Sequence, residues 1–266
     1  MISQRVFSAL LVAPLVLLAV YYGGLPFLAV LVLFAAFAWL ELQQLVQQPV
    51  TAYKYVGLAL LSLVLVLTFF APTTIMPVLA GSLLVLLLVQ LNDFQPNKWT
   101  SAALAITTFF YLALPLVHLL LLRTETGDWR FVALLLITTW GYDTCAFFTG
   151  IRFGRVRPWG KISPKKSLEG MLGGLLGSVL IAALLLFAIM QPGSNRTMWI
   201  GYSLLFGVVV GLLAHFGDLT ESAIKRAYQA KDSGRFLPGH GGLLDRIDSV
   251  LFATIFVYYF VKYLVL

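Results

Sequence analysis

Nine apolar stretches, each of about bilayer length, dominate this chain of 266 residues. A helix that crosses a bilayer needs about 20 predominantly apolar residues, with a range of about 17 to 25. Hydrophobic residues make up 60% of the chain and charged residues only 11%, whereas an ordinary soluble domain has roughly 25% charged residues. The stretches are Val6–Tyr22, Leu25–Leu45, Tyr53–Phe70, Ile75–Leu91, Ala102–Leu122, Phe131–Thr149, Met171–Met190, Met198–Phe216 and Val250–Leu266. We therefore expect lipid to surround most of the chain.

The spanning segments are expected to be helices. Backbone amide groups in hydrocarbon must form their hydrogen bonds internally, and the sequence lacks the alternating ten-residue pattern of membrane barrel strands. The first stretch follows Arg5, as in a signal peptide, but it continues past Pro14 to Tyr22 without a small-residue cleavage site. We therefore predict an all-α, polytopic integral membrane protein with about nine transmembrane helices, the first of them retained.

Positive charge is distributed unevenly between the two faces that nine spans would create. One face has Arg123, Arg130, Arg196 and Lys262, and the opposite face has all the other lysines and arginines, Arg5 included. Basic residues favour the cytoplasmic side of a membrane protein, so we expect the amino terminus and the basic face in the cytoplasm. Because the charge follows the loops in this way, the net charge of +7 does not indicate a nucleic-acid partner.

Polar side chains gather in three places near the predicted cytoplasmic face. Asp143 lies inside the sixth span, where an ionisable residue is costly and is by default a functional candidate; a packing role for a hydrogen-bonded carboxylate is the alternative. Lys165 and Lys166 precede the seventh span, and a helix amino terminus with two lysines attracts anions. A lipid-headgroup anchor would also explain the lysines, although it does not explain Ser163, Pro164 or Glu169. The third place is Ser222–Asp248, with Asp218 just before it.

Within the seventh span, glycines recur at helical spacing. They fall at i, i+3, i+4 and i+7, which places them on one face of a helix: Gly170, Gly173, Gly174 and Gly177. Small residues in such a stripe allow close helix contact in lipid. We expect this face to pack closely against a neighbouring helix.

The carboxylates around the third place have the spacing of a metal site. If the eighth span continues as a helix to about Tyr228, Asp218, Ser222 and Lys225 share one face. Asp245 and Asp248 are likewise three residues apart at the start of the last span. Facing carboxylate pairs suit Mg²⁺, which binds oxygen ligands and recruits substrate phosphates.

The segment between these carboxylates contains glycines that allow backbone N–H groups to approach an anion closely, at positions 239, 241 and 242. Surface salt bridges within Lys231-Asp232 and Asp245-Arg246 are the alternative explanation of the charges, and such bridges are common but weak. His118 and His215, which lie in predicted spans, are expected to be packed histidines. Glu41, near the cytoplasmic end of the second span, is expected to reach toward the interface.

Ser222–Asp248, called the signature segment below, resembles the signature of the phosphatidate cytidylyltransferases (CDP-diacylglycerol synthases) in every residue and spacing. The matching positions are Ser222, Lys225, Arg226, Lys231, Asp232, His240, Gly241, Gly242, Asp245, Arg246 and Asp248. The similarity extends upstream to Asp143 and to most of Ile162–Gly170, so it covers the last half of the chain. Ser167-Leu168 stand where the family often has Thr-Trp, and residues 1–130 match only as apolar helices.

The resemblance implies a membrane enzyme, usually dimeric, that converts CTP and phosphatidic acid to CDP-diacylglycerol and pyrophosphate and requires Mg²⁺. It leaves open whether a monovalent cation is also needed. We place its site at the cytoplasmic face of the cell's inner membrane. Residues 1–130 would be a scaffold of transmembrane helices and a candidate dimer surface, and residues 131–266 would contain the catalytic helices and loops.

Roles follow for individual residues. The predicted metal ligands are Asp218 and Asp245, with Asp248 and Asp143 as secondary candidates. The residues expected to bind substrate phosphates are Lys225, Arg226, Lys231 and Arg246. Further expected contacts with substrate are Ser163, Lys165, Lys166, Ser222, Gly241 and Gly242, and Asp232 and His240 complete the predicted catalytic set. Arg152, Arg155 and Arg157 are expected to serve mainly topology and headgroup attraction.

Two other classes of function remain open at this point. A related CTP-dependent enzyme, such as a polyprenol kinase or an archaeal-type lipid cytidylyltransferase, would use similar groups on another lipid. A secondary transporter would also have many spans and a buried acid such as Asp143, but it predicts polar residues near mid-bilayer in several helices and internal symmetry, neither of which the sequence has.

Overall fold

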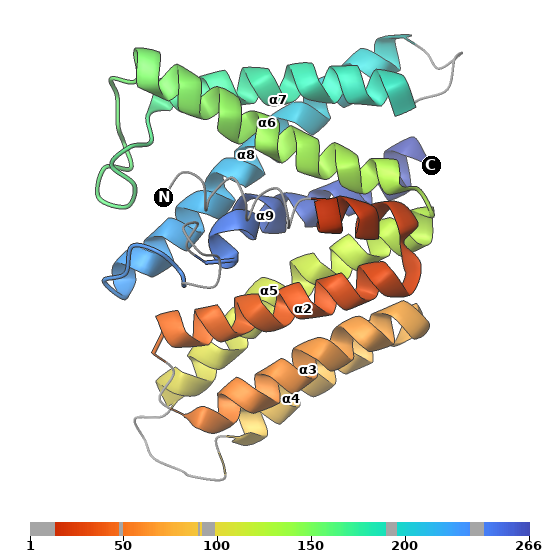
Figure 1. The fold of residues 1–266 in the computed structure, drawn as a ribbon, viewed down its shortest axis with the longest axis vertical. Helices are drawn as coiled ribbons and strands as arrows, with labels where there is room; N and C mark the ends of the chain where they lie inside the picture. The colour runs from red at the N-terminus through yellow and green to blue at the C-terminus, as the bar shows by residue number, and fades with distance from the viewer. Residues whose placement is uncertain (1–13, 48–49, 90, 92–98, 190–195, 235–241) are drawn as a thin grey trace. The chain divides into compact units, whose positions relative to one another are not determined.

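The computed structural model describes residues 14–47, 50–89, 91, 99–189, 196–234 and 242–266 (Figure 1). In these residues the regular elements are helices and no strand occurs. Eight of the described helices are long and apolar enough to cross a membrane, which confirms the all-α, polytopic membrane fold. Residues 6–13 of the predicted first span, Val6–Tyr22, lie outside the described residues, and its described part, residues 14–22, is helical.

The helices follow the apolar stretches of the sequence. They are α2 (Gly24–Leu45), α3 (Thr51–Phe70), α4 (Ile75–Val89), α5 (Trp99–Thr126), α6 (Trp129–Phe153), α7 (Leu168–Ile189), α8 (Arg196–Ala227) and α9 (Leu244–Phe260). A 3₁₀ turn, η1 (Pro72–Thr74), joins α3 to α4, and the chain ends in a π-helical turn, η4 (Val261–Val265). Helix α8 continues about three turns beyond the end of its predicted apolar stretch, Met198–Phe216. These added turns, Gly217–Ala227, contain polar residues.

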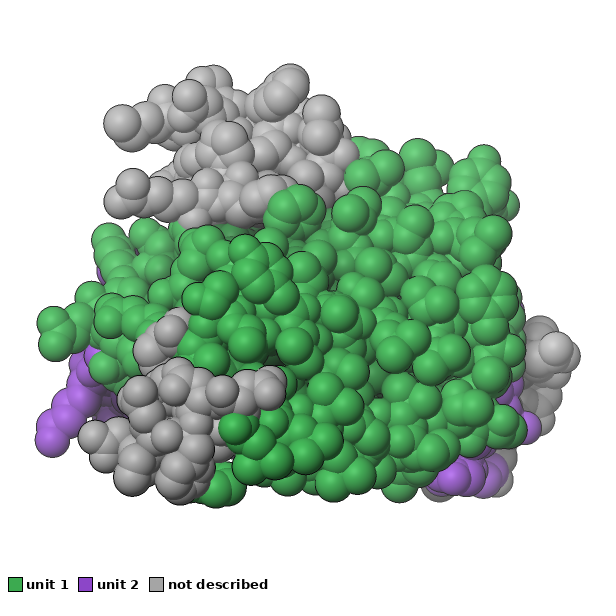
Figure 2. Space-filling model, turned by 90° about the horizontal axis from the view of Figure 1, so that it is seen from below, with its two compact units in different colours: residues 1–127, 227–246 green, residues 128–226, 247–266 purple. Residues whose placement is uncertain are grey.

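The chain divides into two compact units, which are coloured separately in Figure 2 and described one at a time. The first comprises residues 1–127 and 227–246 and contains α2 to α5. Its core is organised around Trp39 of α2, which is fully buried. The Trp39 indole donates to the carbonyl of Lys54 at 2.8 Å and lies edge-on to Phe109 of α5 at 6.3 Å. Gly57 of α3 leaves the space that this indole fills, so α2 packs on both α3 and α5.

The second unit comprises residues 128–226 and 247–266 and contains α6, α7, α8 and most of α9. Helix α7 lies along α6 (Figure 1). The predicted glycine stripe is the reason, because a Cβ atom on Gly174 would lie 2.6 Å from the Tyr142 ring and one on Gly170 would lie 2.9 Å from the carbonyl of Ala146. The expectation of close packing along this face is therefore confirmed.

Helix α8 is joined to its neighbours in the second unit by polar and aromatic contacts. The Ser178 hydroxyl of α7 donates to the carbonyl of Gly207 at 2.7 Å. Toward α9, the Phe206 ring packs on Phe260 at 5.0 Å. A Cβ atom on Gly217 would lie 2.5 Å from the carbonyl oxygen of Asp248, so the backbones of α8 and α9 approach closely at this point. That close approach places the residues next to Gly217 beside Asp248.

Candidate functional site

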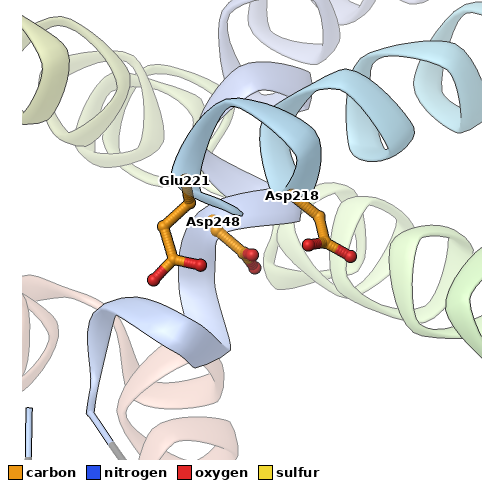
Figure 3. Close-up of side chains that lie close together, drawn as sticks. All are labelled: Asp218, Glu221 and Asp248. Atoms are coloured by element: carbon orange, nitrogen blue, oxygen red, sulfur yellow. The ribbon is translucent and has the colours of Figure 1, made fainter. Parts of the chain in front are cut away.

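Three carboxylates converge where α8 and α9 meet: Asp218, Glu221 and Asp248. We call them the carboxylate trio. Each offers one oxygen, and these oxygens lie within 4.8 Å of one another. Figure 3 shows the Asp248 carboxylate between those of Glu221 and Asp218. Asp218 and Glu221 are three residues apart on α8, so they share a face, and the close backbone contact at Gly217 brings Asp248 to that face.

Two members of the trio are buried, and the side chain of the third, Asp218, is 34% exposed. Glu221 is 0% exposed and Asp248 is 6% exposed. Two lysines balance part of the negative charge: Lys225 Nζ lies 2.5 Å from Glu221, and Lys166 Nζ lies 2.7 Å from Asp218. Buried like charges repel unless a cation or hydrogen-bond donors compensate them, so this arrangement favours a bound cation.

Two hydroxyl groups extend the trio into a larger polar cluster. Ser222 Oγ donates to Asp218 Oδ1 at 3.3 Å, one helical turn away on α8. Ser249 Oγ lies 3.3 Å from both Asp143 Oδ2 and Asp248 Oδ1, and the Ser249 backbone N–H donates to Asp248 at 2.7 Å. Asp143 of α6 is thus connected to the trio through one serine.

The segment between α6 and α7 is fixed by hydrogen bonds that use its polar residues. The Ser167 hydroxyl accepts from the backbone N–H of Gly170 at 3.1 Å, the bond that a serine makes at a helix N-cap. Glu169 accepts from the backbone N–H groups of Arg155 and Val156, at 3.1 and 3.2 Å. These bonds determine where Lys166 stands, one residue before the cap.

A pocket of about 780 Å³ opens beside these residues within the second unit. This volume falls in the range of small-molecule sites, about 300 to 1,000 Å³. The predicted residues in its wall are Asp143, Ser163, Lys165, Lys166 and Asp218, and its apolar wall includes Phe147, Ile151 and Met171. Arg157 also lines the pocket, although the sequence argument had assigned it to topology and headgroup attraction. The pocket thus combines cations, carboxylates and an apolar wall.

The carboxylate trio fits a hard divalent cation. Mg²⁺ binds oxygen ligands at about 2.0–2.1 Å and usually takes one or two protein carboxylates, leaving room for water and phosphate oxygens. Two oxygens on one such ion are therefore about 3 to 4 Å apart, and the oxygens of the trio all lie within 4.8 Å of one another. Asp218 and Asp248 were predicted metal ligands, and Glu221 joins them here.

The other predicted residues of the signature segment lie in different surroundings. Asp245, at the start of α9, accepts from the backbone N–H groups of Ser233 and Gly242 at 3.2 and 3.0 Å. Arg226 donates to the carbonyl of Ile162 at 3.2 Å. The side chains of Lys231, Asp232 and Arg246 are exposed, and His240 and Gly241 lie outside the described residues. The roles assigned to all of these residues stay predictions.

Three residues of the structure were missed or given a lesser role by the sequence argument. Glu221 satisfies the spacing rule that selected Asp218 and Ser222, so the pattern could have found it. His215, expected to be a packed histidine, is indeed buried, at 3% exposed, but it lines the pocket and bonds the Tyr142 hydroxyl through Nδ1 at 2.8 Å. Glu41 is buried in the first unit and binds backbone N–H groups; no sequence pattern pointed to this.

Comparisons with known proteins identify the family of this chain. The sequence model of the Cytidylyltransferase family matches residues 3–264. A phosphatidate cytidylyltransferase of Thermotoga maritima is 35% identical, over 95% of this chain and 93% of the relative. One of Bacillus subtilis is 31% identical, over 97% and 96%, and one of Staphylococcus epidermidis is 36% identical, over 58% and 57%. The match along nearly the whole chain shows that this protein, whose second unit contains the carboxylate trio and the pocket, belongs to the cytidylyltransferase family.

Proposed function

We propose that this protein transfers CMP from CTP to phosphatidic acid, which yields CDP-diacylglycerol and pyrophosphate. The observation that carries the proposal is the composition of the pocket in the second unit. Phosphatidic acid needs a site where a phosphate meets cations at the end of an apolar surface, and Lys165, Lys166 and Arg157 line the same pocket as Phe147 and Ile151. The relatives named phosphatidate cytidylyltransferase cover nearly the whole chain, which supports this choice of lipid.

The reaction is an in-line substitution at phosphorus. An oxygen of the lipid phosphate attacks the α-phosphorus of CTP, the bond from that phosphorus to the β-phosphate oxygen breaks, and pyrophosphate leaves. A phosphate monoester has a second pKa of about 6, so the nucleophile is mostly dianionic at neutral pH and needs no general base. The protein has to position the two substrates and neutralise their charge.

The residues of the pocket and trio can divide these tasks. Lys165 and Arg157 would hold the lipid phosphate, because they line the pocket beside its apolar wall. Lys166 is held by Asp218 at 2.7 Å, so its ammonium group would be kept in place for a phosphate oxygen. Ser222 and Ser249 would orient the carboxylates that they contact.

Mg²⁺ is the proposed cofactor, held by Asp218, Glu221 and Asp248. When bound, it would neutralise charge on the triphosphate and stabilise the leaving pyrophosphate. Asp143, connected to Asp248 through Ser249, would be an outer contributor, and Asp245 keeps its predicted role as a candidate ligand. Whether a monovalent cation also binds is left to experiment.

We also propose the cellular setting that the sequence predicts: the inner membrane, an amino terminus in the cytoplasm, a site on the cytoplasmic face, and a homodimer. The cytoplasmic position is favoured because CTP is a soluble nucleotide and because Lys165, Lys166 and Arg157 belong to the face with the positive excess.

The test uses CTP labelled at one phosphate at a time, with purified protein, phosphatidic acid and Mg²⁺. CMP transfer puts the α-phosphorus label into lipid and leaves the γ-phosphorus label in pyrophosphate. A lipid kinase would put the γ-phosphorus label into lipid and leave the α-phosphorus label in CDP. γ-Label in the lipid would therefore overturn the proposal.

A further inference from the structure

Glu41 on α2 is a buried carboxylate that holds the chain at two places about 200 residues away. It is 6% exposed. Its Oε1 accepts from the backbone N–H of Leu243 at 2.9 Å, and its Oε2 accepts from the backbone N–H of Leu244 at 3.0 Å. Ser233 Oγ lies 3.4 Å from the same Oε2. All four residues belong to the first unit, so this cluster is internal to it.

Two glycines leave the space that the Glu41 carboxylate occupies. A Cβ atom on Gly234 would lie 2.7 Å from Glu41 Cδ, and one on Gly242 would lie 2.7 Å from Glu41 Oε2. A side chain at either position would displace the carboxylate. A buried carboxylate is tolerated only when donors satisfy it, and bonds from N–H groups to a charged acceptor are among the stronger ones in proteins. The site is therefore shaped to hold this acid.

Asp245 accepts hydrogen bonds from the same two parts of the chain that Glu41 contacts. It accepts from the backbone N–H groups of Ser233 and Gly242, at 3.2 and 3.0 Å. Glu41 and Asp245 together contact the chain both before and after positions 235–241. Before them they contact Ser233, and after them they contact Gly242, Leu243 and Leu244. Leu244 is the first residue of α9 and Leu243 directly precedes it. N–H groups at a helix start lack partners within the helix, so Glu41 also acts as a cap for α9 from another helix.

We propose that Glu41 is a positioning residue of the enzyme: it clamps the two ends of the signature segment's glycine-containing part and fixes the first turn of α9. Asp248 of the carboxylate trio lies on the next turn of α9. A first turn that is free to fray would loosen the placement of Asp248. The effect on the reaction rests on the proposed function, whereas the clamp itself does not.

The clamp is tested first without any activity measurement. Glu41→Gln keeps the side chain's size but replaces one acceptor oxygen with an amide group that donates. The glutamine can therefore accept only some of the hydrogen bonds that Glu41 accepts from Leu243, Leu244 and Ser233. Gln43→Leu is the matched control, because Gln43 is a buried polar residue of the same helix that bonds Thr108 instead. In detergent-purified protein, we expect trypsin to cut after Arg235 about 10-fold or more faster in Glu41→Gln than in the wild type, since cleavage follows local opening.

Cleavage after Lys161, in the second unit, should keep its wild-type rate in both variants, and Gln43→Leu should keep the wild-type rate at Arg235. Ser233→Ala, which removes a single weak contact, should accelerate cleavage after Arg235 less than Glu41→Gln does. An unchanged rate after Arg235 in a folded Glu41→Gln protein would overturn the clamp, and so would equal acceleration in Gln43→Leu.

The positioning role is tested next by Mg²⁺ titration of CMP transfer. We expect Glu41→Gln to raise the Mg²⁺ concentration for half-maximal turnover several-fold and Gln43→Leu to leave it unchanged, even if Gln43→Leu lowers thermal stability. Faster cleavage after Arg235 with an unchanged Mg²⁺ requirement would confine Glu41 to a structural role and overturn the positioning role. If the wild type transfers no CMP, the proposed function fails, and the proteolysis still decides the clamp.

Discussion

Two aspartates that are three residues apart on α9 have different surroundings. Asp245 is occupied by the backbone N–H groups of Ser233 and Gly242. Asp248 is buried beside the carboxylates of Asp218 and Glu221, where a cation would relieve repulsion. Charge and spacing in the sequence are the same for both residues, and Asp245 is predicted there as a main ligand and Asp248 as a secondary one. Asp248 lies in the second unit with the other two carboxylates, whereas Asp245 lies in the first unit and its role as a ligand stays a prediction.

The first prediction concerns Glu221, the member of the trio that the sequence argument missed. Glu221→Gln removes a charge but little volume, so it should lower turnover about 100-fold, the scale for loss of one preorganised electrostatic group. It should also raise the Mg²⁺ concentration needed for half-maximal rate. Both quantities come from one titration of CMP transfer.

Asp128→Asn is the control for Glu221→Gln, because Asp128 caps α6 through a bond to the Arg130 N–H that asparagine can also accept. Its Mg²⁺ dependence should equal that of the wild type. A wild-type Mg²⁺ requirement in Glu221→Gln would remove Glu221 from the metal site.

The second prediction concerns the buried pair Tyr142 and His215. Tyr142→Phe deletes the hydroxyl that binds His215 Nδ1 at 2.8 Å and leaves a buried nitrogen without that partner, which costs about 1–3 kcal/mol. Because both residues line the pocket, kcat/KM should fall about 10-fold. Tyr202→Phe, on a ring that packs against Phe260, should have little effect. Equal kinetics in the two variants would show that the pair has no part in substrate binding.

At the scale of helices, the sequence predicted elements well and their contacts less well. The predicted stretch Leu25–Leu45 became α2 (Gly24–Leu45), and Tyr53–Phe70 became α3 (Thr51–Phe70). This succeeds because backbone groups in a bilayer must bond within the helix, so apolar length alone specifies the element. The extension of α8 to Ala227 meets the condition under which Asp218, Ser222 and Lys225 share one face.

Contacts between helices escaped the same reasoning. Glu41 and Leu243 meet through folding of the first unit, and no periodicity within α2 or α9 reports that. Glu221 joins Asp248 only because α8 and α9 touch at Gly217. The glycine stripe of α7 was predicted because its signal lies within one helix, although its partner, α6, was not. Local rules therefore found the candidate residues, and tertiary packing decided their groupings.

The third prediction tests the approach of α8 to α9. Gly217→Ala would put a Cβ atom 2.5 Å from the Asp248 carbonyl oxygen, so the helices must separate there. Overpacking of this kind lowers the free energy of unfolding by about 1–3 kcal/mol. The rate of CMP transfer should fall even where the protein stays folded, because Asp248 moves with the backbone. Gly201→Ala, also on α8, meets nothing within 4 Å and should keep wild-type activity. A Gly217→Ala enzyme with wild-type turnover would show that the trio does not depend on this contact.

At the scale of the whole molecule, the sequence predicts an orientation across the membrane. Most lysines and arginines lie on one predicted face, which the positive-inside rule places in the cytoplasm. Cys145 is the single cysteine, so a Cys145→Ala background allows one reporter cysteine at a time.

The fourth prediction follows from that orientation. In spheroplasts, a membrane-impermeant maleimide should label Ser194→Cys directly and should label Lys161→Cys only after the membrane is permeabilised. The two positions lie on opposite predicted faces, at either end of the seventh span. The reverse pattern would invert the proposed topology and would place the pocket on the side without CTP.

The central claim is that the carboxylate trio of the second unit supports CMP transfer to phosphatidic acid. The most direct measurement is the rate of α-phosphorus label entering lipid for wild type and for Asp248→Asn, each reconstituted in vesicles with phosphatidic acid, CTP and saturating Mg²⁺. We expect the wild type to form labelled lipid in a reaction that depends on Mg²⁺, and an Asp248→Asn protein that still folds and inserts to be about 100-fold slower. No labelled lipid from wild type at any Mg²⁺ concentration, or an Asp248→Asn rate equal to that of wild type, would contradict it.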